Sequence, residues 1–495
     1  MTGRTIWVLG DQLDRSIGPL SGADSTDTIL MVESAEHLAR RPWHRQRVHL
    51  IVAGMRRLAG ELRSDGFDVD YRKAATYEDG LADHRRMRAP DRIVAMAPSS
   101  FGGRALFVRL GVELTADERF LTDPDAFAAL FDGKARLTME VFYRWQRRRL
   151  GYLMDGDQPA TGRWNYDEEN RKSLPKGGVD FPEPMVDALD EIDAAVLHDL
   201  PSTTVGAEPI GVWPTSRAAA LARLRHAIDE VLPRFGPYED AMTTTSWHLA
   251  HTLLSPALNV GLLHPREVAD AIEEAWRAGK VPIASAEGLL RQVIGWREFV
   301  WCLYWHEGPS YIDRNELDAR RPLPPVFVTG RTDMACVSHV LADVDTYGWT
   351  HHIPRLMILG NLALLAGVEP RSLLEWMWER FVDGAEWVMV PNVIGMALHA
   401  DGGRMATKPY AAGGAYIDRM SDFCSGCRYD RKRRTGEQAC PFTTLYWDFL
   451  ARHTDRLAGN HRMSRQVAAS RALVDLPEVR SRAAVVLEQL DAGTL

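Results

Sequence analysis

The sequence predicts an α/β protein in two parts: an N-terminal doubly wound parallel sheet, a long interdomain connection, and an all-α C-terminal domain. Three observations lead to this fold class. The chain has 495 residues, too many for a single hydrophobic core. Its beginning alternates short apolar runs with amphipathic helical patterns, as βαβ units do. Its second half shows only the 3.6-residue period of helices.

Residues 1–130 are expected to form the sheet domain. Amphipathic stretches such as Val48–Arg63 and Gly102–Leu110 separate its apolar runs. In such a sheet, ligands bind beyond the carboxyl ends of the strands, where Asp11 and Glu33 lie. No G-x-G-x-x-G pattern is present, so we expect no dinucleotide in this domain. The expected strands are Thr5–Leu9, Thr28–Val32, Val69–Arg72, Arg92–Ala97 and a weaker Val112–Leu114.

The rest of the chain divides into a connection and a helical domain. Residues 131–215 are irregular and rich in Gly, Pro, Asp and Asn, which predicts a long connection packed across the surface. Residues 216–495 have a helical period, with Ser216 as the first N-cap and Pro233 closing the first helix. The expected helices are Arg217–Leu232, Pro265–Ala278, Glu287–Trp305, Pro354–Leu365, Arg371–Phe381 and Leu445–Leu457.

Composition excludes several classes of protein. A hydrophobic fraction of 45% and a charged fraction of 25% are typical of an ordinary globular protein. The chain shows neither a secretory signal nor an apolar run long enough for a membrane span, so we expect a cytoplasmic monomer. The net charge of −8 argues against indiscriminate nucleic-acid binding. Two cationic runs, Arg144–Arg149 and Arg428–Arg434, are either solvated faces or phosphate contacts.

Four of the five cysteines lie in the C-terminal third and predict a metal site rather than disulfides. Cys424 and Cys427 can bind one metal centre from a tight turn, and Cys440 is followed by proline, as in bacterial ferredoxins. Cys336, in a loop-like stretch, is a better fourth ligand than Cys302, which suits an apolar helix. This spacing leaves zinc and an iron–sulfur cluster equally open.

Other segments carry polar groups with more than one interpretation. Thr252 and Ser255 precede a helix, where their hydroxyls either bind a phosphate or only cap the helix. His351 and His352 point in different directions as neighbours on a helix start, so they cannot chelate one ion. Either can transfer a proton or be structural. Asp383 lies in a turn between two helices and is exposed there.

Taken together, these segments resemble the cryptochrome/photolyase family. The loop from Ser255 to Gly261, Trp296-Arg297-Glu298, Trp349 with His351, and Asp383-Gly384 occur in that family's order. The cysteines make the chain similar to the iron–sulfur bacterial cryptochromes and photolyases, the prokaryotic (6-4) photolyase branch. The likeness covers essentially the whole chain and includes Leu9–Leu13, Arg163–Arg171 and Val388–Gly402.

The resemblance implies light-driven repair of (6-4) pyrimidine–pyrimidone photoproducts in DNA. Excited, fully reduced FAD would pass an electron to a flipped-out lesion, and His351 or His352 would deliver a proton. A U-shaped FAD would lie in the helical domain. The residues implied at this cofactor are Thr252, Ser255, Asn259, Arg297, Arg355, Trp376, Asp383 and Asn392.

The resemblance also implies two further groups and a DNA contact. Cys336, Cys424, Cys427 and Cys440 would hold a 4Fe–4S cluster, which decides the question of metal in favour of iron. An antenna, 6,7-dimethyl-8-ribityllumazine, would lie near Asp11, Glu33 and the loop after the fourth strand. The Arg428–Arg434 run would contact DNA phosphates beside the lesion.

The chain departs from the family's pattern at the aromatic residues that bring electrons to the flavin. Trp376 matches the member of that aromatic chain nearest the flavin. Met377 stands beside it, and Val328 stands where the outer tryptophan of the family is expected. These replacements suggest slow photoreduction or a route through Trp378, Trp301 or Trp305. His37 stands where relatives tend to place a carboxylate near the antenna. The alternatives are a cryptochrome-like blue-light photoreceptor of the same fold and a zinc-bearing nucleic-acid-binding protein without flavin.

Overall fold

Five parallel strands form the N-terminal sheet, in the order β3-β2-β1-β4-β5. The structure, a computed structural model, describes residues 3–134, 136–175 and 177–495. The strand order reverses between β1 and β4, which places a ligand crevice at the carboxyl ends of these two strands. The strands are β1 (Arg4–Trp7), β2 (Thr28–Ser34), β3 (Asp68–Ala74), β4 (Arg92–Met96) and β5 (Glu113–Thr115).

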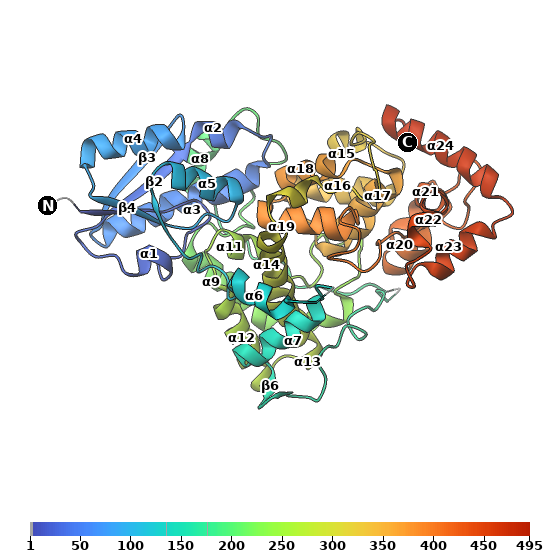
Figure 1. Ribbon diagram of the computed structural model, residues 1–495, viewed down its shortest axis with the longest axis horizontal. Helices are drawn as coiled ribbons and strands as arrows, with labels where there is room; N and C mark the ends of the chain where they lie inside the picture. The colour runs from blue at the N-terminus through green and yellow to red at the C-terminus, as the bar shows by residue number, and fades with distance from the viewer. Residues whose placement is uncertain (1–2, 135, 176) are drawn as a thin grey trace.

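Helices cover both faces of this sheet, as the sequence predicts for a doubly wound fold (Figure 1). Alternate residues of β1 point to opposite faces: Ile6 packs with the apolar side of α3, whereas Trp7 packs with Leu81 of α4 and Phe107 of α5. The helices of this part are α1 (Gly18–Ser21), α2 (Ala35–Ala39), α3 (Arg45–Ser64), α4 (Tyr77–Arg88) and α5 (Phe101–Arg109).

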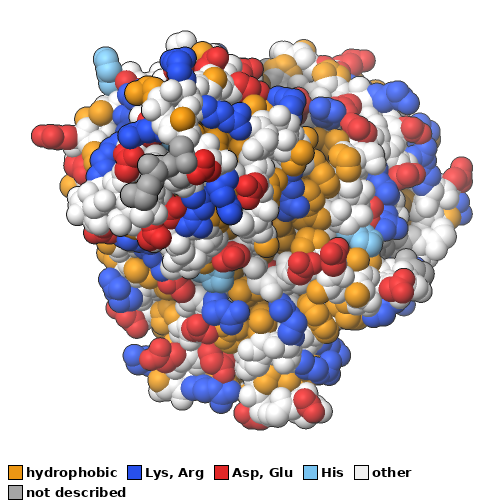
Figure 2. Space-filling model, turned by 60° about the vertical axis from the view of Figure 1, so that its left-hand side comes forward, with side chains coloured by type: hydrophobic (Ala, Val, Ile, Leu, Met, Phe, Trp, Pro, Cys, Tyr) orange, Lys and Arg blue, Asp and Glu red, His pale blue; other side chains and the backbone are white. Residues whose placement is uncertain are grey.

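The surface mixes both signs of charge. On the face shown in Figure 2, lysine and arginine side chains alternate with aspartate and glutamate, and apolar side chains gather in a band between them. Within the described residues, no helix combines the length and the apolar character that crossing a bilayer would require.

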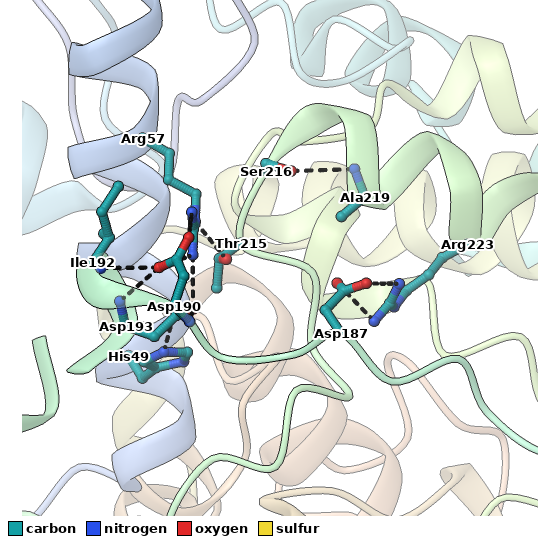
Figure 3. Close-up of polar contacts among 10 residues, drawn as sticks. All are labelled: His49, Arg57, Asp187, Asp190, Ile192, Asp193, Thr215, Ser216, Ala219 and Arg223. Atoms are coloured by element: carbon teal, nitrogen blue, oxygen red, sulfur yellow. Dashed lines mark hydrogen bonds and ion pairs between the residues drawn. The ribbon is translucent and has the colours of Figure 1, made fainter.

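The connection is ordered against both parts of the molecule. In Figure 3, Arg57 of α3 donates to Asp190 (2.6 Å) and Asp193 (2.7 Å) at the start of α8 and to Thr215 Oγ1 (2.9 Å). Further along, Asp187 pairs with Arg223 of α9 at 2.9 Å. The proposed domain boundaries remain predictions. The elements between the sheet and α9 are α6 (Pro124–Phe131), α7 (Met139–Leu150), β6 (Met154–Asp155), β7 (Gln158–Pro159) and α8 (Glu191–Asp199).

From residue 216 onward the described chain is helical, as expected, but several expected helices are interrupted by wider π-helical turns. Pro233 does not end the first one: it is the second residue of the short helix α10, which follows such a turn directly. The first elements are α9 (Arg217–His226), η1 (Ala227–Val231), α10 (Leu232–Phe235), η2 (Gly236–Tyr238), α11 (Ser255–Asn259), α12 (Pro265–Arg277), α13 (Ile283–Leu290), η3 (Arg291–Trp296) and α14 (Arg297–Glu307).

The remaining elements complete the helical part and end at the far side of the molecule from the sheet (Figure 1). They are η4 (Pro309–Asp313), α15 (Val326–Thr329), α16 (Ala335–Tyr347), η5 (Pro354–Gly360), α17 (Asn361–Ala366), α18 (Pro370–Arg380), α19 (Glu386–Val390), η6 (Pro391–Ala397), α20 (Gly414–Met420), η7 (Phe423–Gly426), α21 (Pro441–Arg452), α22 (Thr454–Leu457), α23 (Ser464–Arg471) and α24 (Leu476–Ala492).

Candidate functional site

A buried ion pair lies at the centre of the helical part. Arg355 of η5 donates to both carboxylate oxygens of Asp383, at 2.9 and 3.1 Å. The same carboxylate accepts a hydrogen bond from Ser255 Oγ at 2.8 Å, and Asn259 Nδ2 donates to the Asp383 carbonyl at 2.9 Å. The structure therefore brings together four of the predicted site residues, from α11, η5 and the turn after α18.

Local backbone geometry explains why these groups can approach so closely. A Cβ atom at Gly384 would lie 2.7 Å from the Trp378 carbonyl oxygen and 2.9 Å from Arg47 Nη1, so only glycine fits beside Asp383. The loop before α11 carries two leucines, Leu249 and Leu253, with φ of 48° and 56°. Such left-handed conformations are unfavourable for leucine, and they concentrate at functional sites.

The two predicted histidines lie beside this ion pair in different environments. His351 is buried, and both of its ring nitrogens lack a hydrogen-bond partner. Its ring stacks on His251 with centroids 4.3 Å apart. His352 is exposed, yet surrounding protein desolvates its ring and lowers its pKa to about 4. This combination is typical of a side chain inside a cavity, and the unpartnered nitrogens suit a polar ligand.

Other residues predicted at the cofactor lie further out or have different partners. Arg297 packs over Phe120, 4.3 Å from its ring centroid, and donates to the Arg119 carbonyl at 3.3 Å. Asn392 donates within its own helical segment to the Val388 carbonyl, at 2.8 Å. Trp376 donates to the Phe327 carbonyl, and Thr252 is only partly buried.

The predicted antenna residues lie at the carboxyl edge of the sheet. Asp11, after β1, accepts a hydrogen bond from Ser99 Oγ at 3.0 Å and pairs with Arg119 at 2.7 Å. This contact lies at the reversal of strand order. Glu33 at the end of β2 is instead bound by Arg56, at 2.8 and 3.0 Å, and by the Tyr71 hydroxyl.

His37, which departs from the family pattern, lies close to the same edge. Its ring centroid is 5.4 Å from that of Tyr77, and Asp11 and Arg40 are among its charged neighbours. Desolvation, reinforced by Arg40 and Arg47, lowers the pKa of His37 to about 3, so the ring is neutral at pH 7. A neutral imidazole therefore stands where a carboxylate was expected.

Four cysteines line one cavity at the far end of the helical part. Cys336 comes from the first turn of α16, Cys424 and Cys427 from the turn around η7, and Cys440 from the N-cap of α21. Burial, and then the nearness of the other three thiols, raises the pKa of Cys336 well above its usual range. Cys302 is fully buried in α14, away from this cavity, as a small hydrophobic residue.

These thiols do not close around a point. In the part of the chain that is described, no group of three or more His, Cys, Asp or Glu side chains is arranged to hold a single metal ion. Zinc would require four sulfur atoms each about 2.3 Å from one centre. Gly414 lets the chain approach this cavity closely, since a Cβ there would lie 2.9 Å from Cys440 Sγ.

The two cationic runs are largely engaged in internal contacts. Arg147 is buried and donates to the backbone carbonyls of Trp164 and Leu153, so it holds the connection in place. In the second run, Arg428, Arg431 and Arg434 each pair with an aspartate. Lys432, with an exposed side chain, is better placed than these three for contacts outside the molecule.

Sequence reasoning missed two residues at the site. His251 stacks on His351, and its position directly before Thr252 could have drawn attention to it. Arg47 reaches across from α3 to donate to the Trp378 carbonyl at 2.7 Å. Burial and the neighbouring Arg40 lower the pKa of Arg47 to about 9. No local pattern predicts this residue, because the contact joins segments more than 300 residues apart.

Comparisons with known proteins identify the family of this chain. The family model described as deoxyribodipyrimidine photo-lyase-related protein matches residues 6–208. A (6-4) photolyase of Agrobacterium fabrum is 40% identical over 505 residues, covering 98% of this chain and 99% of the relative. An uncharacterized protein, R855, of Acanthamoeba polyphaga mimivirus is 31% identical over 103 residues, covering 21% of this chain and 76% of that protein.

Solved structures show the same fold. A bacterial class III photolyase from Agrobacterium tumefaciens superposes with a TM-score of 0.61 at 14% identity, covering 99% of this chain and 98% of the other. A cryptochrome of Synechocystis sp. superposes with a TM-score of 0.54 at 14% identity, covering 79% and 82%. At this identity the superpositions establish the fold alone.

Proposed function

Because this chain belongs to the photolyase/cryptochrome family, we propose that it repairs (6-4) pyrimidine–pyrimidone photoproducts in DNA with light. The observation that carries the proposal is the full-length likeness to a (6-4) photolyase. In this chain, a buried Arg355–Asp383 pair lies near two histidines. Repair of this lesion needs an electron, which the bound flavin would supply, and a proton, which one of the two histidines would supply.

FAD is the cofactor that we propose for the cavity, and the residues present fit it. Ser255 would contact its phosphates, while Arg355 and Asp383 would lie beside the ring system; Thr252, Asn259, Arg297, Trp376 and Asn392 are the further proposed contacts. The unpartnered nitrogens of His351 are polar atoms that a bound ligand could satisfy. When bound and fully reduced, this flavin supplies the excited electron that splits the lesion.

His351 and His352 are the residues that we propose for proton transfer. Desolvation lowers the pKa of both rings, so both are neutral at pH 7. A neutral imidazole has one N–H proton and one lone pair, so it can release a proton at one nitrogen while accepting one at the other. His251, stacked on His351, holds that ring in place.

We also propose that Cys336, Cys424, Cys427 and Cys440 hold a 4Fe–4S cluster. The four thiols line one cavity, and the resemblance to the iron–sulfur branch of the family favours a cluster over zinc. The thiols would bind as thiolates, each supplying one ligand to the cluster. The loop from Cys427 to Cys440 would place Lys432 near DNA phosphates.

A lumazine antenna, a cytoplasmic location and a monomeric state complete the proposal. The antenna, 6,7-dimethyl-8-ribityllumazine, would occupy the carboxyl edge of the sheet near Asp11 and His37. Glu33 would support this site through α3, because Arg56 already neutralises its carboxylate.

A cryptochrome-like photoreceptor of the same fold is the second candidate, and one observation favours it. Trp376 packs against Phe327 (ring centroids 5.1 Å apart), and beyond it Val328 is 67% exposed. Neither phenylalanine nor valine relays an electron readily. Repair needs a fully reduced flavin. An interrupted electron route would therefore impair a repair enzyme more than a photoreceptor.

The deciding experiment uses the full chain, isolated with its flavin and reduced chemically before illumination. We expect an oligonucleotide with one (6-4) photoproduct to be restored under blue light and not in the dark. The His351→Ala and His352→Ala variants test the proton role, since at least one should lose repair while still binding FAD. Lack of repair by the pre-reduced, flavin-loaded protein would favour the photoreceptor. Unchanged repair in both variants would remove the histidines from the mechanism.

A further inference from the structure

A second group of aromatic side chains connects the proposed flavin cavity with the surface. Trp349 is 5% exposed and donates through Nε1 to Ser255 Oγ at 3.4 Å, so it contacts the hydroxyl that binds Asp383. The Trp247 ring lies 5.7 Å from the Trp349 ring between centroids. Tyr347 stacks flat on Trp247, with centroids 4.0 Å apart and an interplanar angle of 11°.

The three rings form a path from inside to outside. Trp349 is buried, whereas Trp247 and Tyr347 are both partly exposed. Tyr347 is the last residue of α16, and the chain turns at Gly348 (φ 62°) to bring Trp349 inward. Because of this turn, Tyr347 lies at the outer end of the path and Trp349 at its inner end, although only Gly348 separates them in the sequence.

The other aromatic groups are less well placed. Trp376 leads outward only to Phe327 and then to exposed Val328. Trp301 and Trp305 are neighbours, with centroids 5.4 Å apart. Trp301 stacks on Phe120 and Trp305 makes an edge contact with Phe101, however, and both phenylalanines come from segments of the sheet domain. Trp378 lies against Trp43 of that same domain.

We propose that Trp349, Trp247 and Tyr347 carry electrons from solution to the flavin cavity, replacing the interrupted route through Trp376. The inference rests on the proposed function, because it requires FAD in the cavity. It assigns a role to three residues that the repair chemistry itself does not use.

The step balances with a soluble thiol as the reductant. Oxidised FAD, excited by blue light, would supply the electron acceptor. Trp349 would give up one electron to it and become a radical cation, and Trp247 would then return an electron to Trp349. Tyr347 reduces Trp247 in turn and releases its phenolic proton to water, which leaves a neutral tyrosyl radical. The thiol reduces this radical and supplies the hydrogen atom that restores the phenol, and two such radical thiols combine as a disulfide.

Trp247→Phe is the main test, measured on the FAD-loaded full chain with a thiol under blue light. We expect the rate of flavin photoreduction to fall at least tenfold, because phenylalanine does not relay the electron. Trp247→Tyr should recover most of the rate, which separates a redox role from a packing role. Trp301→Phe, the matched control, should leave the rate within about twofold of the original.

Flash absorption and electron paramagnetic resonance provide a readout that does not depend on repair. We expect a tyrosyl radical after the flash in the original protein, and none in Tyr347→Phe. A rate in Trp247→Phe within twofold of the original, or a tenfold loss in Trp301→Phe, would overturn the proposal.

Repair by chemically pre-reduced protein distinguishes this inference from the proposed function. That repair should be the same in Trp247→Phe and in the original chain, because the route is needed only to reduce the flavin. If the pre-reduced original fails to repair, but the same protein with oxidised flavin forms the tyrosyl radical after the flash, the repair function falls and the electron route stands. If the isolated chain binds no flavin, both fall.

Discussion

Replacing Asp383 by alanine should destabilise the helical part strongly. The substitution removes both acceptors of the Arg355 guanidinium, at 2.9 and 3.1 Å, and the acceptor of Ser255 Oγ. The side chains of Asp383 and Arg355 are 9% and 18% exposed, so water cannot fully replace the lost partner. Removing one partner of a buried pair costs about 3–5 kcal/mol, because the other charge remains buried and unpaired.

The assay is urea unfolding of the full chain without FAD, followed by tryptophan fluorescence. With an m-value of about 3 kcal/mol/M, this loss lowers the urea midpoint by about 1–1.7 M. The matched control is Asp475→Ala, which breaks the half-exposed pair with Arg434 and should cost about 0–1 kcal/mol. If both variants lower the urea midpoint equally, the Arg355–Asp383 pair does not stabilise the fold more than the half-exposed Arg434–Asp475 pair does.

Three further outcomes are expected. Ala89→Gly should stabilise the protein by about 1 kcal/mol in urea unfolding, because Ala89 ends α4 in a left-handed conformation, with φ of 42°, that glycine adopts more easily. Ala82→Gly, inside the same helix, is the control and should destabilise the protein by about 1 kcal/mol. Cys336→Ser should lower bound iron and sulfide in chemical analysis, and Cys302→Ser should leave both unchanged. Burial lowers the pKa of His251 to about 3, so this ring is neutral when folded and protonates when unfolded below about pH 6.5. Stability should therefore fall as pH drops from about 6.5 toward 3, and His251→Phe should show a smaller loss of urea midpoint between pH 7.5 and 5; an equal loss would contradict this.

The fold was largely predictable from the sequence because hydrophobic periodicity is a local signal. All five strands occur where alternating apolar runs indicated them, within one or two residues. The π-helical turns were not predictable in this way. Each inserts one residue without changing composition, so the sequence pattern of the segments around Pro233 and Arg355 looks like a continuous helix.

The sequence predicted only those residues of the candidate site that belong to a recognisable motif. Ser255, Arg355 and Asp383 were placed by resemblance, and the structure brings them together. His251 and Arg47 escaped prediction because their roles arise from contacts across the fold. The path through Trp247 escaped prediction for the same reason. Trp247 comes from a different segment than Tyr347 and Trp349, and only folding brings its ring against both of theirs.

The position of the cysteines in the fold indicates what a cluster there would do mechanically. Cys336 lies in the first turn of α16, and Tyr347 ends that helix just before Trp349 and the histidines. Thirteen residues of α-helix span roughly 20 Å, which is too long for direct contact between the two sites. A rigid helix nevertheless transmits position, because packed side chains resist sliding. A cluster that tethered the first turn of α16 to η7 and α21 would therefore hold the other end of this helix in place. The histidine pair would then keep its position relative to the Arg355–Asp383 pair.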